Sequence, residues 1–506
     1  MLSCHIPSKH DLLVIVHLIC CMCGIGSLSI PYIFAQAGPI YSILAFLLNG
    51  CINTYATVAL SHCLLKLRHL PHIHTYTDLA VHVWGRKGVY IVQATQLASC
   101  FLLPVAFLVL GGATLLPVIF EGAIDLSPAV WIVLMAIVLL PIIYIRVLHE
   151  AYIVLISGAA ATFVADVIAT VDAYVAHGDE LYEPTDTIGF TNVLDTFGSF
   201  ALAYGAAVVI PQLQHHHPQP EKMPTALVYG MLLMSGFYVT LGALGYAHFG
   251  CASPNNLLLA MSHTTSRRRV AYTSMFLHVS MAFGVLVNPF FVTVEKSMFP
   301  PSLLQDERDN NDDEEAVDMG TCDIDIDEVS FHPLDTPKKN EDGPTIPPLD
   351  SIKQPSGGND NTEASISSTA STSSENSRRI VFRTIIVAIQ CFLATLLQSS
   401  FYDMADLIGA SLANICSVIM PLLLYYKLFA NEMSKTHKLL CWTVILVSIL
   451  LGSYSTIHAI RRIVKNASEY TVFASAPSAK RTSYPLCPAG YADRKAQWLD
   501  SFTLFY

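Results

Sequence analysis

Eleven apolar stretches, each about 20 residues or longer and poor in charge, limit the folds that this sequence can adopt. A helix of that length spans the ~30 Å hydrocarbon core of a bilayer, since it rises about 1.5 Å per residue. The apolar runs are continuous and do not alternate with period two, which argues against an outer-membrane β-barrel. We therefore predict an all-α polytopic membrane protein with about eleven transmembrane helices. Numbered in chain order, the predicted spans lie near residues 12–36, 39–66, 89–120, 129–147, 150–174, 194–213, 224–249, 271–297, 380–400, 405–429 and 438–461.

Basic residues in the short connections orient these spans. Most of them fall on the side that is cytoplasmic if the N-terminus is cytoplasmic, as the positive-inside rule requires. An odd number of spans then places the C-terminus outside, where Asn466-Ala-Ser468 would be an N-glycosylation acceptor close to the membrane. The exceptions to the rule are Arg267, Arg268, Arg269, Arg461, Arg462 and Lys465.

A long insertion separates span eight from span nine. Residues 302–377 carry 19 Asp or Glu and four Lys or Arg, a net charge of 4 − 19 = −15, in a chain whose total is −11. Such a polar, acidic composition favours disorder. We predict an acidic disordered cytoplasmic insertion at 298–379, with a cytoplasmic partner or a kinase acting within 302–377. The other predicted parts are a cytoplasmic N-terminus (1–11), spans one to eight (12–297), spans nine to eleven (380–461) and a non-cytoplasmic C-terminal tail (462–506).

Span one contains residues that break a helix. Its central sequence GIGSLSIPYIFAQAG holds glycines and a proline, which cost about 1 and 3 kcal/mol in a helix interior. Span six repeats the pattern in FGSFALAYGAAVVIPQLQ, residues 197–214. Paired broken helices in two halves of a chain are typical of transporters built from inverted repeats, which bind substrate at such breaks. The pairing of span one with span six predicts a five-plus-five inverted repeat, with span eleven outside it.

The same segments resemble signatures of the amino acid/auxin permease family. The first stretch follows its G-x-G-x-L-x-x-P-Y-x-F-x-x-x-G pattern, and AYGAAVVIPQLQHHHPQPEKMPTAL is similar to its sixth helix and the following loop. TYTDLAVHVWGRKG, GYAHFGCASPNNLL and LIGASLANICSVIMPLLLYY agree as well, so the resemblance covers nearly all of residues 10–460 outside the insertion. The sequence departs from the family at the insertion and at His215–His217, where basic residues are usual.

This resemblance implies a leucine-transporter-like fold and a secondary active transporter of amino acids that works by alternating access. Transport in the family is typically coupled to protons, as symport or exchange, and sometimes to sodium. The plasma membrane and a vacuolar or lysosomal membrane are both open as locations. The bilayer and an amino acid are the expected partners, and no nucleic acid is expected.

Exposed backbone at the two breaks is the predicted substrate site. Amides at the start of the outer half of span one are expected to receive the substrate carboxylate, because free helical amides attract anions. Carbonyls at the break of span six, placed at 197–199, would accept the α-ammonium group. Alternatively, the glycines only permit close packing of helices. The predicted substrate-binding residues are Gly24, Gly26, Ser27, Phe197, Gly198, Ser199 and Tyr204, the last of which would close over the ligand.

Two ionisable residues within the spans are candidates for coupling. Such groups are costly in hydrocarbon and mark ion or proton pathways. Asp166 lies in the middle of span five and His278 in span eight, and each could load and release a proton. Sodium is the alternative ion, held by carbonyls beside Ser27 or Ser280; no other cofactor is expected. Four acidic residues nearer the outer edge are expected to be hydrated: Asp172, Asp195, Asp403 and Asp406.

Other functional classes fit less well. The histidines at 69, 72, 74 and 215–217 lack the helical spacing of membrane di-iron sites, so neither an enzyme nor a metal centre is predicted. The 13 cysteines show no finger spacing and no visible disulfide framework, and we interpret most as small apolar side chains. An amino-acid-sensing receptor, signalling through the acidic loop, remains the alternative to a transporter. Deleting 302–377 and comparing uptake with downstream response would separate the two.

Overall fold

The structure is a computed structural model, in which most of the described residues of the predicted spans are helical. The described residues are 8–70, 73, 75–124, 126–144, 151–176, 183–185, 188–215, 217–261, 266–298, 362–468 and 486–491. Regular structure in these ranges is helical throughout, without a strand. Eight helical segments in the described ranges are long and apolar enough to cross a membrane, which confirms an all-helical polytopic membrane protein. They are 39–67, 87–119, 190–215, 220–252, 266–295, 377–396, 398–429 and 435–466.

Helix also occurs at the other three predicted spans. Span one consists of α1 (Lys9–Met22), α2 (Ile25–Leu28) and α3 (Ile30–Ala37). Span four corresponds to α8 (Pro128–Tyr144), and span five to α9 (Ala151–Ala176). Span one is interrupted, and α8 and α9 are not among the eight segments that are long and apolar enough to cross a membrane. The count of eleven spans therefore remains a prediction.

The acidic insertion lies largely outside the described residues, at 299–361. Its last part is helical, because α15 begins at Thr362 and continues without interruption to Leu396. The sequence from 362 to 396 contains neither glycine nor proline, so nothing in it stops a helix that extends back from span nine. Residues Pro301–Ile385 form a compact unit separate from the rest of the chain. The predicted partner or kinase at 302–377 stays a prediction.

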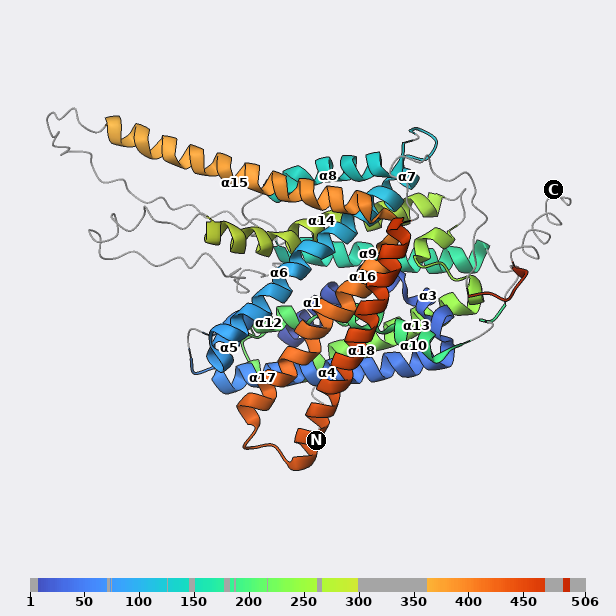
Figure 1. The fold of residues 1–506 in the computed structure, drawn as a ribbon, viewed down its shortest axis with the longest axis horizontal. Helices are drawn as coiled ribbons and strands as arrows, with labels where there is room; N and C mark the ends of the chain where they lie inside the picture. The colour runs from blue at the N-terminus through green and yellow to red at the C-terminus, as the bar shows by residue number, and fades with distance from the viewer. Residues whose placement is uncertain are drawn as a thin grey trace, which may run out of the picture. The chain divides into compact units, whose positions relative to one another are not determined.

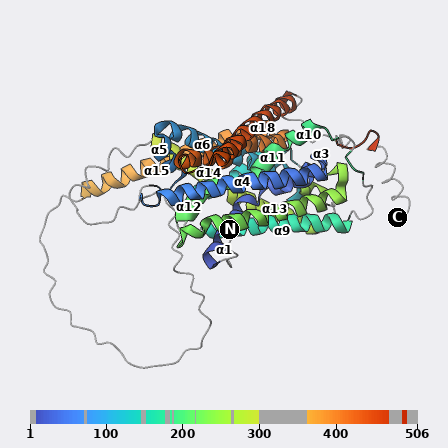
Figure 2. The same cartoon turned by 90° about the horizontal axis from the view of Figure 1, so that it is seen from below.

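In the larger unit, Met1–Pro300 and Ile386–Tyr506, two long helices each pack against several others. Helix α13 (Met223–Phe249) lies along α4 (Pro39–Leu67) and also packs against α1 and α3, as Figures 1 and 2 show. Helix α14 (Ser266–Met298) packs against α9 and α6 (Arg86–Val109). The broken span one therefore has α13 on one side and α9 on another, since α1 contacts both.

Span ten is wound unevenly. It begins with α16 (Phe401–Ile408), continues through the π-helical segments η8 (Gly409–Ala413) and η9 (Ile415–Ile419), and ends with α17 (Met420–Phe429). Wide π-helical turns inside membrane helices are frequent at functional sites. Segment η8 contacts α11 (Phe197–Ala203) of span six, and α18 (Lys435–Ser468) packs against α16 and η8.

Several outer basic residues that violate the positive-inside rule are ion-paired. Arg267 Nε lies 3.1 Å from the Asp172 Oδ1 atom, and Arg268 Nη1 lies 2.8 Å from Glu121 Oε2. The Asp172 side chain is fully buried. The expectation that this carboxylate is merely hydrated was therefore wrong, because α14 supplies the basic partner that span five lacks in its own sequence.

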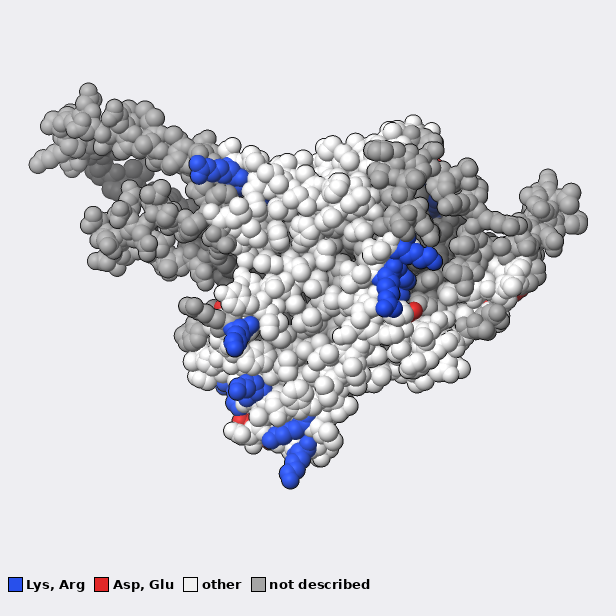
Figure 3. All heavy atoms as spheres, in the orientation of Figure 1, with Lys and Arg blue, Asp and Glu red and all other residues white. Residues whose placement is uncertain are grey.

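The visible surface of the described residues is mostly uncharged. In Figure 3 the lysines and arginines gather in a few clusters, two of which lie over the two ends of α18, and a broad uncharged area separates these two. Helix α18 has 34 residues, and its segment from 435 to 466 is apolar enough to cross a membrane. Charge at both ends and apolar residues between them fit a helix that crosses the bilayer.

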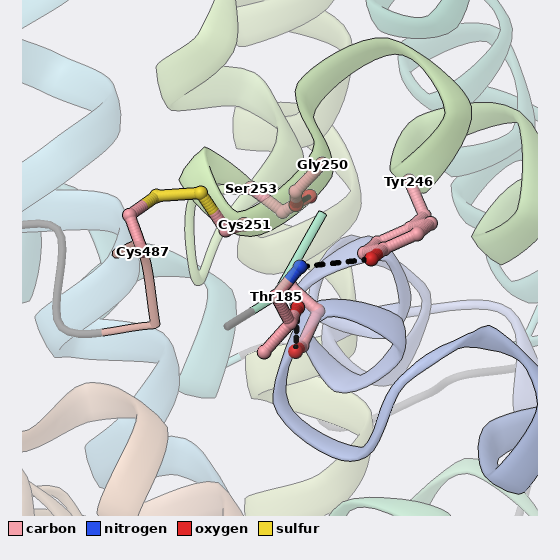
Figure 4. Close-up of a disulfide and its surroundings, with 7 residues drawn as sticks. Thr185, Tyr246, Gly250, Cys251, Ser253 and Cys487 are labelled. Atoms are coloured by element: carbon pink, nitrogen blue, oxygen red, sulfur yellow. Dashed lines mark hydrogen bonds between the residues drawn. A yellow bond between two sulfur atoms is a disulfide. The ribbon is translucent and has the colours of Figure 1, made fainter. Parts of the chain in front are cut away.

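One disulfide corrects the interpretation of the cysteines. Cys251 in η4 (Gly250–Ala252), just after α13, is bonded to Cys487 near the C-terminus (Figure 4). A separation of 236 residues explains why no local spacing reveals the pair. Disulfides form and persist in oxidising compartments.

The short segment 183–185 is tied to the same region. Cys251 donates its amide to the Glu183 carbonyl at 2.9 Å. The Thr185 amide donates to the Tyr246 hydroxyl at 3.2 Å, as Figure 4 shows, and the Thr185 hydroxyl donates to the Ala35 carbonyl at 2.6 Å. These bonds connect the end of α3, the second half of span one, to α13 and the disulfide.

Glycine packing between α11 (Phe197–Ala203) and span ten provides a test of the fold. A Cβ atom at Gly198 would overlap the Asp406 backbone, and one at Gly409 would overlap the Gly198 carbonyl. We expect Gly198→Ala to lower the free energy of unfolding by roughly 1–3 kcal/mol, the typical cost of overpacking. Gly236 in α13 has open space at the same position, so Gly236→Ala is the matched control and should be neutral or up to about 1 kcal/mol stabilising. Thermal unfolding in detergent measures both; equal midpoints for the two variants would contradict this packing.

Candidate functional site

Span one breaks where the sequence predicts. Helix α1 ends at Met22, and Gly24 has an extended backbone, with φ −177°, before α2 starts. The Gly24 carbonyl accepts bonds from both the amide of Ser27, at 3.1 Å, and its hydroxyl, at 2.8 Å. The first amides of α2 have no acceptor within the helix. The break thus places backbone groups that lack helical partners in the interior of the helix bundle.

Span six breaks seven residues after the position that was predicted. Helix α10 (Phe190–Asp195) and α11 precede an unwound stretch at Tyr204–Ala206, followed by η2 (Ala207–Val209) and α12 (Ile210–His215). The predicted break at 197–199 was wrong because Gly198 lies in a helix, where its missing side chain makes room for span ten. Pro211 accounts for the true position, since it cannot donate the bond that would continue an α-helix from Ala207.

Tyr238 joins the two breaks. Its hydroxyl lies 2.7 Å from the Met22 carbonyl and 3.0 Å from the Ala203 carbonyl, which are the last residues of α1 and α11. Both carbonyl oxygens lie within 3.0 Å of one hydroxyl, so the two helix ends lie close together. The side chain is fully buried. No pattern in span seven distinguishes this tyrosine from a core aromatic residue, and sequence reasoning missed it.

Close packing of the two half-helices supports the same geometry. A Cβ atom at Gly26 would lie 3.3 Å from Ala203 Cα. Because glycine has no side chain, Gly26 allows α2 to approach α11. This is the role that the alternative interpretation, close packing of helices, gives to the glycines. The aromatic residues Phe46, Phe200, Tyr204 and Tyr238 surround this contact, and Phe46 of α4 has its ring centroid 4.4–6.4 Å from those of the other three.

Asp166 of α9 lies beside the break in span one. Its side chain is fully buried, and neither carboxylate oxygen has a hydrogen-bond partner among the residues that the structure describes. Ser27 and Tyr238 are close enough to interact with it electrostatically. The Ser27 hydroxyl, however, donates to the Gly24 carbonyl in this conformation. The carboxylate is thus placed next to the unwound backbone and within reach of the Ser27 hydroxyl.

His278 of α14 lies on the other side of Gly24. Its Nδ1 atom is 2.9 Å from the Gly158 carbonyl of α9, and its Nε2 atom is 3.3 Å from the position of a Cβ at Gly24. A carbonyl only accepts, so Nδ1 carries a proton and Nε2 of the neutral ring is the acceptor that faces the break. Both predicted coupling residues therefore lie at the broken part of span one, together with Gly24, Gly26 and Ser27.

The side chains of the other predicted substrate-binding residues contact other helices. The Tyr204 hydroxyl is 2.8 Å from the Ser235 hydroxyl of α13. The Ser199 hydroxyl donates to Asp406 Oδ1 in span ten. Phe197 packs with Ala201 of its own helix and with Ala410 of η8. Their roles in binding substrate stay predictions.

The start of α1 and the loop after α12 are also joined. His217, in the loop after α12, places Nε2 3.1 Å from Oδ1 of Asp11 at the start of α1, and its side chain is buried. The Ser61 hydroxyl of α4 donates to Oε1 of Gln214 at 2.7 Å. In the described ranges, no group of three or more His, Cys, Asp or Glu is arranged to hold a metal ion.

Comparison with known proteins agrees with this arrangement. Residues 12–461 match the family described as transmembrane amino acid transporter protein. Two proteins of Arabidopsis thaliana, named amino acid transporter AVT1E and AVT1D, are 19% and 20% identical over 451 and 459 residues. These alignments cover 88% of this chain and 71% and 69% of the relatives. A third protein of that plant, amino acid transporter AVT1I, is 25% identical over 285 residues, which are 55% of this chain and 68% of its own.

The family match includes both broken spans and both halves of the membrane region on either side of the insertion. It confirms the resemblance to amino acid permeases that the first and sixth spans carry. It also places the protein among transporters and not among enzymes. The chain therefore belongs to the transmembrane amino acid transporter family.

Proposed function

We propose that this protein is a secondary active transporter that moves amino acids across its membrane by alternating access, coupled to protons. The observation that carries the proposal is the pair of bonds from Tyr238, because it sets the two helix breaks against each other. Where the two breaks face each other, backbone polar groups from both halves of the chain are available to one substrate. The relatives' names describe amino acid transporters, which agrees with this substrate class.

The proposal includes eleven crossings, a leucine-transporter-like five-plus-five inverted repeat, and α18 outside the repeat. The positions of the breaks support the repeat, since span one and span six both unwind in the interior. The disulfide supports the orientation, because it assigns an oxidising environment to the end of span seven. With the N-terminus in the cytoplasm, span seven ends on that outer side. The plasma membrane and a vacuolar or lysosomal membrane both meet this condition.

The substrate carboxylate is assigned to the backbone at Gly24, Gly26 and Ser27. Its ammonium group is assigned to the carbonyls from Ala203 to Gly205, since those at Phe197–Ser199 belong to a continuous helix. Tyr204 contributes backbone at this point, while its ring closes the aromatic wall beside Phe46. No basic side chain is required for the carboxylate, because free amides beside a break already attract an anion.

Asp166 and His278 are the proposed proton carriers. They approach the same break from α9 and α14, and both lie within the interior of the bundle. A proton that binds to either side chain changes the charge next to the proposed substrate position. Proton binding and substrate binding therefore affect each other. Ionisable groups at such depth mark proton pathways in transporters. Sodium remains the alternative ion for the carbonyls beside Ser27 or Ser280.

Tyr238→Phe tests whether the joined breaks matter for transport. The variant keeps the ring and loses one buried hydroxyl, so we expect uptake to fall about tenfold, the equivalent of ~1.4 kcal/mol for one lost buried hydrogen bond. Tyr272→Phe is the matched control, since Tyr272 is also buried and donates to the Leu258 carbonyl, at 3.0 Å, away from the breaks. Uptake of labelled amino acids in vesicles gives the readout. Equal uptake by the two variants would argue against the joined breaks.

Asp166→Asn and His278→Gln test the coupling. Asparagine keeps the shape of aspartate, glutamine keeps a polar side chain in place of the histidine ring, and each change removes a proton-binding site. We expect at least one variant to lose accumulation driven by an imposed proton gradient while it still exchanges labelled for unlabelled amino acid. His248→Gln, near the outer end of α13, is the control and should behave as the wild type. If both variants accumulate substrate with the wild-type pH dependence, another group carries the proton.

A further inference from the structure

Three carboxylates converge on one arginine where the outer ends of three helices meet. The Arg462 guanidinium of α18 donates to Asp403 Oδ1 at 2.5 Å through Nε and to Asp406 Oδ2 at 2.7 Å through Nη2. Its Nη1 atom lies 3.9 Å from Oδ2 of Asp195 at the end of α10. The planar fork of arginine suits several carboxylates at once, which a lysine ammonium does not match. One side chain thus holds α10, α16 and α18 together.

The network continues on both sides of Arg462. Asp406 accepts a bond from the Ser199 hydroxyl of α11, so the arginine acts on the outer half of span six through that carboxylate. The Asn466 amide donates to Asp403 Oδ2 at 2.9 Å and to the Ser400 hydroxyl at 3.1 Å. This amide is the predicted glycosylation acceptor, and in the structure it is part of the network. His458 Nδ1 lies 3.4 Å from Asp195 Oδ1.

The same region contacts the outer half of span one. The Tyr402 hydroxyl of α16 donates to Oε1 of Gln36 in α3 at 3.2 Å. The rings of Tyr402 and Tyr32 pack edge to face, with their centroids 5.0 Å apart. The outer halves of both broken spans are therefore connected to α16, and α16 is held by Arg462.

Charge makes this arrangement depend on the arginine. Asp403 and Asp406 are buried, and the Asp406 side chain has no exposed surface at all. Removing one partner of a buried ion pair leaves an uncompensated charge, which is strongly destabilising for that conformation. Without Arg462, the neighbouring carboxylates would repel one another and favour separation of the helices that carry them.

We propose that Arg462 is a positioning residue that latches the outer halves of spans one, six and ten shut, and that its release opens the substrate site to the outer side. The proposal rests on the proposed function, because it assumes that the breaks hold the substrate. It gives α18, the helix outside the repeat, a part in the transport cycle. Arg462 acts through the carboxylates and through Ser199, and does not itself contact the breaks.

Cys23 is a native reporter for this opening. It directly precedes Gly24 in the break of span one, and its side chain is 2% exposed. A membrane-impermeant thiol reagent, applied from the side that carries the disulfide, should reach it only when the outer side opens. Cys23→Ser versions of each variant give the background from other cysteines, so the difference reports Cys23 alone. The experiment uses the full chain in proteoliposomes and needs no knowledge of the substrate.

We expect Arg462→Gln to raise the rate of Cys23 labelling at least tenfold over the wild type. Arg461→Gln is the matched control: it removes the same charge from the adjacent, exposed position and should leave the rate unchanged. Arg462→Gln combined with Asp406→Asn should return the rate toward the wild-type value, because the second change removes one repelling carboxylate. The thermal unfolding midpoint of each variant separates stability from opening: a midpoint restored by Asp406→Asn while Cys23 labelling stays fast would overturn the latch.

Equal labelling of the Arg462→Gln and Arg461→Gln variants would overturn the proposal. Arg462→Lys keeps the charge, so it serves if the glutamine variant does not fold; it should label faster than the wild type because it lacks the fork. A wild-type rate in Arg462→Lys would likewise overturn the latch. Failure of the proposed function has a different signature, since a protein that does not transport amino acids would still show the labelling differences among these variants.

Discussion

The hydroxyl of Tyr238 and the two carbonyls that share it set the geometry on which the rest of this protein depends. Backbone groups inside a bilayer must be satisfied within the protein, because no water is present to bond with them. Two broken helices would each leave such groups unpaired. By placing the ends of α1 and α11 against one tyrosine of α13, the fold gives the Met22 and Ala203 carbonyls a shared donor and brings the break at Gly24 close to that at Tyr204–Ala206. Asp166 and His278 then reach that region from α9 and α14.

Polar contacts on each side of this centre connect helices that a transporter must move. On the inner side, His217 pairs with Asp11, and Gln214 accepts a bond from Ser61. On the outer side, Arg462 holds Asp403 and Asp406. The first set joins parts of the two broken spans to each other and to α4. The second set joins α18 to α16, and Asp406 extends it to Ser199 of α11. Alternating access needs one set to open while the other stays closed.

The sequence predicts the broad architecture well, because hydrocarbon thickness fixes helix length and because Gly and Pro mark the break in span one. It places the break in span six too early, since a glycine that permits helix packing looks the same in sequence as one that ends a helix. Local sequence patterns do not reveal contacts between residues that are distant in the sequence. The Cys251–Cys487 bond spans 236 residues, and the ion pairs of Arg267 and Arg462 join separate spans. Tyr238 gave no signal, because a buried tyrosine in an apolar helix resembles any core aromatic residue.

The central claim is that amino acids bind at the facing breaks and move with protons. Purified protein in vesicles, supplied in turn with each member of a labelled amino acid panel, tests it most directly under imposed proton or sodium gradients. The account predicts that a proton gradient alone drives at least one amino acid to accumulate above its equilibrium level, and that collapsing the gradient releases it. Accumulation that follows the sodium gradient and ignores protons would contradict the assigned coupling. Absence of gradient-driven uptake for every amino acid would contradict the account as a whole.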